Sequence, residues 1–272
     1  MHHTSFLTKE DRDRAEQFLN DGYIIQACES MDSLHELRGT IMNQANEWLA
    51  EHHDKSRIVS LADSHQVVPE ERINELRLKL FAGLNANPGT RLSYFCLAST
   101  LIQSLVGNEL AMQNKVNVSI QQPLDQSSVL ELHSDVWTGD SPFQVVLWVP
   151  LTDASDTNAM FLLSPSESRV AYKKSRQGEL DSMAAIHEAY KSQFRPIEVR
   201  YGEVLLFDSN CLHGNQLNTT TTTRWSFNCR FVSLLAPSTT PERRLGSFYT
   251  PIMVRPATVM GIRAVEALGL VD

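Results

Sequence analysis

The chain has 272 residues, 42% of them hydrophobic, and a formal net charge of −8 at pH 7. This length suits one large domain or two small ones, and the apolar fraction is enough for an extensive core. No apolar run reaches the roughly 18 residues of a membrane span, and an acidic chain without a Lys/Arg cluster argues against nucleic acid or an anionic membrane as a partner.

The N-terminus and the cysteines indicate a reducing compartment. The first residues, MHHTSFLTKEDRDRAEQF, lack a basic segment followed by an apolar one, so we expect no signal peptide and a cytoplasmic location. The four cysteines form no CxxC pair. We expect reduced thiols, with Cys211 and Cys229 as small core residues.

The first third of the chain has the pattern of helices. LTKEDRDRAEQFLNDGYI (7–24) predicts a helix between Thr8 as N-cap and Gly22 as the stop. A second helix is predicted to begin with Ser33 and Glu36 in capping-box spacing. Two more are predicted over 70–82 and 92–106, separated by the loop GLNANPGTR.

After about residue 114 the pattern becomes that of short strands. The predicted strand segments are KVNVSIQQ, FQVVLWVPLTD, AMFLLSPSES, PIEVRYGEVLLFDSN and RWSFNCRFVSLL, the third stopped by Pro165 and the fourth forming two strands around a Tyr-Gly turn. One amphipathic helix is expected over about 179–194. Many short strands separated by turns indicate a jelly-roll sandwich or barrel.

We therefore predict an α+β fold with one domain over residues 1–272. Residues 1–112 would be mainly helical support, 113–235 the β core, and 236–272 a C-terminal segment. Its stretch RRLGSFYTPIMVRPAT is too long and apolar for a free tail. We expect that stretch either to close over the site or to form a subunit contact, which leaves a homo-oligomer open.

The stretch ELHSDVWTGDSP (131–142) places His133 and Asp135 two residues apart, and His213 ends a later strand. Residues i and i+2 of an extended segment point to the same side. A single HxD pattern or a single His is more often structural, but two imidazoles and one carboxylate on one face form the facial triad of non-haem Fe(II) oxygenases. We predict these three as the metal ligands and catalytic residues. The positions left free on the metal suit a bidentate 2-oxo acid and O₂.

A dicarboxylate cosubstrate also needs a cation. Arg224 follows His213 by eleven residues and Arg230 by seventeen, and both have the strand parity of Thr222, Ser226 and Asn228. Cations on an inward face require anions, which a 2-oxo dicarboxylate supplies through paired charge-assisted hydrogen bonds. Either arginine could serve on this argument.

Other classes of protein stay open. A non-redox, cupin-like metal isomerase or sugar-binding barrel has no use for the arginine, and an oxygenase fold kept only for binding has no need of a complete triad. The presence of Asp135 argues against halogenation, because a halide would need the carboxylate position. An acyl-CoA or amino-acid substrate also stays open, although no Lys/Arg cluster suited to the phosphates of CoA is visible.

These motifs resemble the phytanoyl-CoA dioxygenase-type branch of Fe(II)/2-oxoglutarate oxygenases. The segments that carry the resemblance are LTKEDRDRAEQFLNDGYI, LHSDVW, MFLLSPSES, GEVLLFDSNCLHGNQLN and TRWSFNCRF, and they touch most of the chain. HSDVWTGDSPFQVVLWVPLTD and HGNQLNTTTTTRWSFNCRF are more narrowly similar to a subgroup encoded in sugar-biosynthesis clusters, including aminoglycoside pathways.

The resemblance implies a double-stranded β-helix with Fe(II) on the triad. It implies that Arg224 binds the far carboxylate of 2-oxoglutarate, with Arg230 as the competing candidate, and that Asn215 makes a polar contact to the cosubstrate. Gln121, on the strand before HxD, faces the cosubstrate or, equally well, the core or solvent. Residues 165–168 read Pro-Ser-Glu-Ser, where the family often has Pro-Gly-Ser-His, so any contact made by that His is absent.

Trp137 and Asp140 follow the ligands directly. Tryptophan stacks on sugar faces and aspartate accepts hydrogen bonds from hydroxyls or amines, so we expect both residues to border a sugar or aminosugar substrate. The alternative is that Trp137 packs under a loop and Asp140 caps a turn. Hydroxylation, desaturation, ring closure and epimerisation would all use the same Fe(II), 2-oxoglutarate and O₂.

Overall fold

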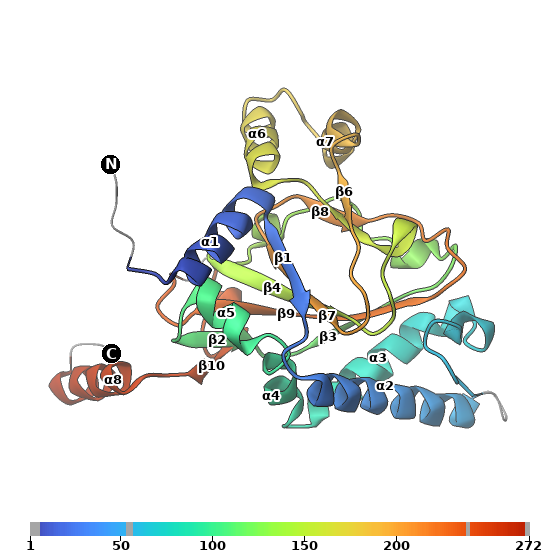
Figure 1. Cartoon of the computed structure of the whole chain (residues 1–272), viewed down its shortest axis with the longest axis horizontal. Coiled ribbons are helices and arrows are strands. Elements are labelled where there is room, and N and C mark those ends of the chain that lie inside the picture. The colour runs from blue at the N-terminus through green and yellow to red at the C-terminus, as the bar shows by residue number, and fades with distance from the viewer. Residues whose placement is uncertain (1–5, 53–56, 238–239, 270–272) are drawn as a thin grey trace.

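A computed structural model describes residues 6–52, 57–237 and 240–269. Two antiparallel sheets form the centre of the molecule (Figure 1). The larger has the order β1-β7-β4-β9-β2-β10, with β3 also paired to β9, and the smaller has the order β6-β5-β8. The strands of the larger sheet are β1 (Tyr23–Ala27), β2 (Leu110–Gln113), β3 (Asn117–Gln121), β4 (Gln144–Pro150), β7 (Glu203–Asp208), β9 (Arg224–Ser233) and β10 (Tyr249–Met253). Those of the smaller are β5 (Met160–Leu162), β6 (Arg195–Ile197) and β8 (His213–Asn215).

Helices cover both sides of this β core. In Figure 1, α2 and α3 lie below the sheets, and α6 and α7 lie above them. The helices are α1 (Lys9–Asp21), α2 (Met31–His52), α3 (Ile73–Ala86), α4 (Thr90–Phe95), α5 (Ser99–Val106), α6 (Pro165–Arg176), α7 (Met183–Tyr190) and α8 (Pro256–Leu268). None of the helices in the described ranges is long and apolar enough to cross a membrane. The predicted α+β jelly-roll architecture is confirmed, and the single-domain organisation stays a prediction.

Strand parity decides which side chains enter the space between the sheets. On β4, Val146 and Trp148 face the smaller sheet, where they pack with Met160 of β5 and Leu205 of β7. Their neighbours in sequence pack against the helices, as does Trp225 of β9. The residues of β9 that alternate with Trp225, among them Arg224 and Arg230, therefore point between the sheets, as the strand parity in the sequence predicted.

The helix predictions were correct at α1 and wrong at several other boundaries. Thr8 accepts from the Asp11 N–H and Gly22 closes α1 in the left-handed region, at φ 82°. The predicted capping box at Ser33 is wrong, because α2 begins at Met31 and the Ser30 hydroxyl accepts from the Ser33 N–H.

The predicted loop from Gly83 is also wrong, because α3 continues to Ala86. The single helix predicted over 92–106 is in fact α4 and α5, interrupted between Phe95 and Ser99. Packing of α3 against α2 and β3 overrides the unfavourable helix propensity of Gly83.

Pro165 starts a helix that the sequence reasoning missed. It stands in the first turn of α6, where its missing N–H is harmless, and Ser164 and Glu167 form a capping box around it. The helix expected over 179–194 is limited to α7, with its N-cap at Ser182. Together, α6 and α7 cover the outer face of the smaller sheet at Phe161.

Candidate metal centre

The three predicted ligands come together where β8 meets the segment before β4. The backbone N–H of His133 donates to the carbonyl of His213 and the reverse bond is also made, each at 2.9 Å. This pair of bonds holds the two imidazole rings 4.3 Å apart, centroid to centroid. Asp135 opens the short 3₁₀ turn that follows, Asp135–Thr138. The candidate ligand atoms of all three side chains lie within 4.8 Å of one another.

Local hydrogen bonds orient both imidazoles. Nδ1 of His133 lies 2.8 Å from the carbonyl of Glu131, and Nδ1 of His213 lies 2.8 Å from the carbonyl of Cys211. Nδ1–H is therefore the donor in each ring, which leaves the Nε2 lone pair free for a metal. The two Nε2 atoms lie 3.8 and 4.0 Å from Oδ1 of Asp135. Burial, reinforced by the neighbouring His133, lowers the pKa of His213 to about 4, so the ring is neutral at pH 7.

The triad lines a cavity of about 140 Å³ between the two sheets. Its walls include apolar residues and inward-facing polar residues of β3 and β9, among them Val146, Trp148, Ser119, Asn228, Arg224 and Arg230. A metal held by the triad would therefore share one small cavity with two arginines.

Arg224 is a buried cation without a carboxylate partner. It is 3% exposed, and its Nε donates to Oε1 of Gln121 at 3.2 Å while Nη1 donates to the hydroxyl of Ser226 at 3.3 Å. Among the described residues, no carboxylate oxygen lies within the 4.0 Å of an ion pair with it. Burial, together with repulsion from Arg77, lowers the pKa of Arg224 to about 10. Such a site favours an anionic ligand.

Arg230 has the opposite character. Its Nη2 lies 2.9 Å from Oδ2 of Asp135, its Nε lies 3.0 Å from Oδ2 of Asp140, and its Nη1 donates to Oε1 of Gln113 at 3.2 Å. Despite burial, the two carboxylates raise the pKa of Arg230. Arg230 therefore already has the anions that Arg224 lacks.

The chain matches the phytanoyl-CoA dioxygenase (PhyH) family over residues 24–226. The chain belongs to this family. It is thus an Fe(II)- and 2-oxoglutarate-dependent non-haem oxygenase, an oxidoreductase. No curated protein sequence matches the chain.

Several solved structures share the fold of this PhyH-family protein. A nickel complex of the non-haem monooxygenase ThoJ is 17% identical with a TM-score of 0.51, over 94% of this chain and 96% of ThoJ. HygX from Streptomyces hygroscopicus, with nickel and 2-oxoglutarate bound, is 15% identical with a TM-score of 0.50, over 91% of this chain and 98% of HygX. EctD from S. alaskensis with bound Fe is 17% identical with a TM-score of 0.54, over 88% of this chain and 83% of EctD. At these identities the likeness shows the fold alone.

The family's metal and cosubstrate fit the residues of the cavity. Two neutral imidazoles and one carboxylate are a donor set suited to Fe(II), and Arg224 provides an unpaired cation for a dicarboxylate. The His that the family often has three residues after the proline is Ser168 here. The neighbouring Ser164 and Glu167 cap α6.

The predicted cosubstrate contacts Gln121 and Asn215 have partners within the protein. Gln121 accepts from Arg224 and donates to the carbonyl of Gln216 at 2.6 Å, so it supports Arg224. The amide of Asn215 accepts from the N–H of Leu130 and donates to the carbonyl of Ser128 at 3.2 Å. Asn215 therefore fixes the segment that leads to His133, while its side chain also lines the cavity.

Of the two predicted substrate contacts, only Trp137 is open to solvent. Trp137 is 44% exposed, and its ring meets that of Tyr172 edge-on at 4.8 Å. Asp140 is 2% exposed and lies between Arg230 and Arg243, whose Nε is 2.8 Å from Oδ1. The expected substrate contact of Asp140 is therefore not supported, because both of its oxygens already face arginines.

Arg243 and Gln113 were missed by the sequence reasoning. Both act through partners from distant segments, so no local motif marks them. The C-terminal segment contacts residues around the triad: Arg243 pairs with Asp140, β10 pairs with β2, and the Tyr249 hydroxyl donates to Gln144. Closure of this segment over the site and a subunit contact both stay predictions.

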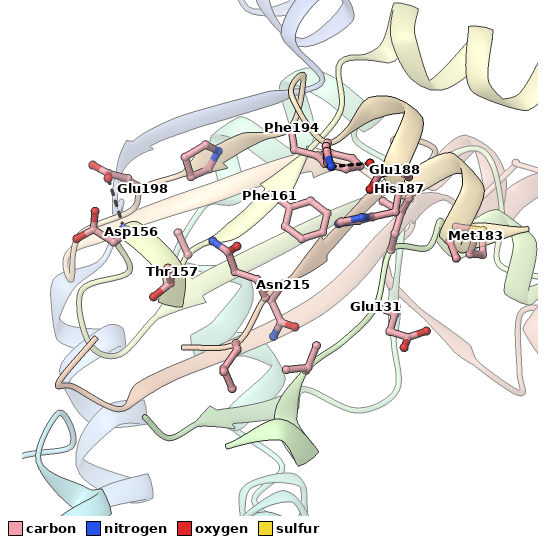
Figure 2. Close-up of a pocket in the computed structure, with 18 residues that line it drawn as sticks. Glu131, Asp156, Thr157, Phe161, Met183, His187, Glu188, Phe194, Glu198 and Asn215 are labelled. Carbon is pink, nitrogen blue, oxygen red and sulfur yellow. Dashed lines mark hydrogen bonds and ion pairs between the residues drawn. The ribbon is translucent and has the colours of Figure 1, made fainter. Parts of the chain in front are cut away.

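A second cavity, of about 930 Å³, lies on the other side of the smaller sheet. Figure 2 shows Phe161, His187 and Phe194 close together among the residues that line it, with Asn215 below Phe161 in this view. The rings of Phe161 and His187 meet edge-on at 6.2 Å. None of the three triad residues lines this cavity, whereas Asn215 lines both this cavity and that of the metal centre.

Proposed function

We propose that this oxygenase hydroxylates an unactivated C–H bond of a small polar metabolite, a sugar or aminosugar derivative of a biosynthetic pathway. In this proposal, His133, Asp135 and His213 hold Fe(II), and Arg224 binds the far carboxylate of 2-oxoglutarate. The observation that carries it is one small cavity that combines the triad with an unpaired, buried arginine. A non-redox metal barrel would have no reason to bury that charge without a partner.

The chain's own residues prepare the site for this chemistry. When bound, Fe(II) and 2-oxoglutarate supply the O₂ activation that attack on such a bond requires. The carbonyls of Glu131 and Cys211 keep both imidazoles in the ligand tautomer. Gln121 and Ser226 fix the direction of the Arg224 guanidinium. Apolar side chains such as Trp148 wall the cavity and limit access of water.

The surroundings of the site support a polar substrate. The His133 side chain is 24% exposed while that of Asp135 is 5% exposed, so the centre opens to solvent beside His133. Ser128 and Asn228 supply polar groups to the same cavity, and Trp137 offers an exposed aromatic face of the kind that stacks on sugar rings.

The first experiment is a visible spectrum of the apoprotein with Fe(II) and 2-oxoglutarate in the absence of oxygen. We expect a metal-to-ligand charge-transfer band, weakened in Arg224→Ala unless the cosubstrate concentration is raised. Arg195→Ala, at an exposed position of β6, is the matched control and should leave the band unchanged. Stoichiometric iron binding without a band would favour a non-redox metal barrel instead.

The substrate class needs a second measurement. Substrate-dependent formation of succinate should be stimulated by members of a sugar and aminosugar panel, and Trp137→Ala should raise the KM for the active compound. Stimulation by acyl-CoA or amino-acid compounds alone would keep the oxygenase assignment and refute the proposed substrate.

A further inference from the structure

We propose that Arg230 is a positioning residue that keeps one oxygen of Asp135 bound to the protein and leaves the other for the metal. The inference rests on the proposed function, because it assumes that Asp135 is a ligand. Arg230 was the competing candidate for binding the cosubstrate. The inference gives it a different role.

The two oxygens of Asp135 have different surroundings. Oδ2 lies 3.0 Å from Nε and 2.9 Å from Nη2 of Arg230, with Nε2 of Gln144 at 3.5 Å. Oδ1 instead faces Nε2 of both triad histidines, at 3.8 and 4.0 Å. A carboxylate held in this way presents Oδ1 to a metal between the imidazoles, while Oδ2 is engaged by its donors. Monodentate ligation keeps free the position that a bidentate carboxylate would take.

Arg230 is itself held in place by other segments. It pairs with Asp140 at 3.0 Å and with Gln113 at 3.2 Å. Asp140, with its side chain 1% exposed, is also paired with Arg243 at 2.8 Å. A series of ion pairs, Arg243–Asp140–Arg230–Asp135, therefore connects the C-terminal segment to the metal centre.

A purely structural ion pair is the competing explanation, and metal affinity separates the two. Partners that orient a ligand typically contribute a factor of about 10–100 to metal affinity. We expect Arg230→Gln to weaken Co²⁺ binding to the apoprotein by about tenfold or more, measured by calorimetric titration. Arg230→Lys, which retains the charge, should recover part of this loss.

Arg224→Gln provides the contrast within the same strand. It should leave the affinity for Co²⁺ within about twofold of wild type while weakening 2-oxoglutarate binding to the Co²⁺-loaded protein. Arg230→Gln at saturating Co²⁺ should show the reverse, with 2-oxoglutarate affinity nearly retained. This crossed result would not arise from a general loss of stability.

Arg230→Gln leaves two buried carboxylates with less compensation, so a folding control is required. The double variant Arg230→Gln/Asp140→Asn removes one cation together with one anion, and should show the same weakened Co²⁺ binding with a cooperative thermal transition. If the variants lower the melting temperature but bind Co²⁺ as wild type does, the inference is overturned. If wild type itself binds no stoichiometric Co²⁺, the proposed function fails first.

Discussion

Replacing Arg224 by Met should stabilise the apoprotein slightly. A folded-state pKa of about 10, against 12.5 for a free guanidinium, means that the folded state binds this proton less tightly than the unfolded state does. At pH 7, which lies below both values, the buried cation therefore costs about 3 kcal/mol of folding stability. Removing the guanidinium leaves Oε1 of Gln121 and the hydroxyl oxygen of Ser226 without their donor, at about 1 kcal/mol each. The net gain is about 1 kcal/mol, or roughly 2–4 °C in Tm.

The same substitution should remove most of the affinity for 2-oxoglutarate. Losing one partner of a buried, hydrogen-bonded charge pair costs about 2–5 kcal/mol, so Kd should rise by at least about 30-fold. Thermal melts followed by circular dichroism give the first quantity, and calorimetry on Ni²⁺-loaded protein gives the second.

Arg91→Met is the matched control for this prediction. Burial also lowers the pKa of Arg91, which donates to the carbonyl of Met112 at 3.1 Å and does not line the cavity. Its variant should bind 2-oxoglutarate normally. An Arg224→Met protein that loses more than about 2 kcal/mol of stability yet retains wild-type affinity would refute the assignment, because Arg224 would then be a structural cation.

Two further predictions concern stability and the geometry around the triad. Glu29 accepts from the first backbone N–H groups of α5, so Glu29→Gln should cost about 1 kcal/mol. Burial raises its pKa, but those hydrogen bonds outweigh it and lower the pKa below 4.5. This contribution is thus present above pH 4.5 and is lost as the pH falls through the folded-state pKa, so melts at pH 7 and about pH 3 should show the difference between wild type and variant shrinking. A Cβ on Gly214 would lie 2.8 Å from the carbonyl oxygen of Leu130, so Gly214→Ala should displace the segment before His133 and weaken Co²⁺ binding by about tenfold. Gly39→Ala in α2, where a Cβ meets nothing within 4 Å, should instead add about 0.5–1 kcal/mol of stability and leave Co²⁺ binding unchanged.

The sequence predicted those features of the site that depend on local spacing. His133 and Asp135 are close in sequence, and strand parity alone directs Arg224 and Arg230 to the same side of β9. The change from helical to strand-like periodicity likewise located most of the β core. These features need only the geometry of a single strand.

Features that depend on competition between segments were not predictable. Pro165 was expected to end a strand, and the same residue also suits the first turn of a helix. The segment Ser164–Glu167, which begins α6, contains a capping box that signals the helix. Its polar composition is equally typical of a loop. The strands β1, β2 and β10 were missed because each gains its stability by pairing with a distant partner.

The distinction between the two arginines shows why the site itself needed a structure. Arg224 and Arg230 are chemically identical, lie on one strand and have the same parity. What decides between them is which carboxylates approach: Asp135 and Asp140 both reach Arg230, and none among the described residues reaches Arg224. A charge that the protein neutralises is free to orient a ligand, whereas a charge left unpaired costs stability until an anion binds. The residue that destabilises the apoprotein is therefore the one we expect to bind 2-oxoglutarate, and the Arg224→Met experiment tests both halves of that statement in a single variant.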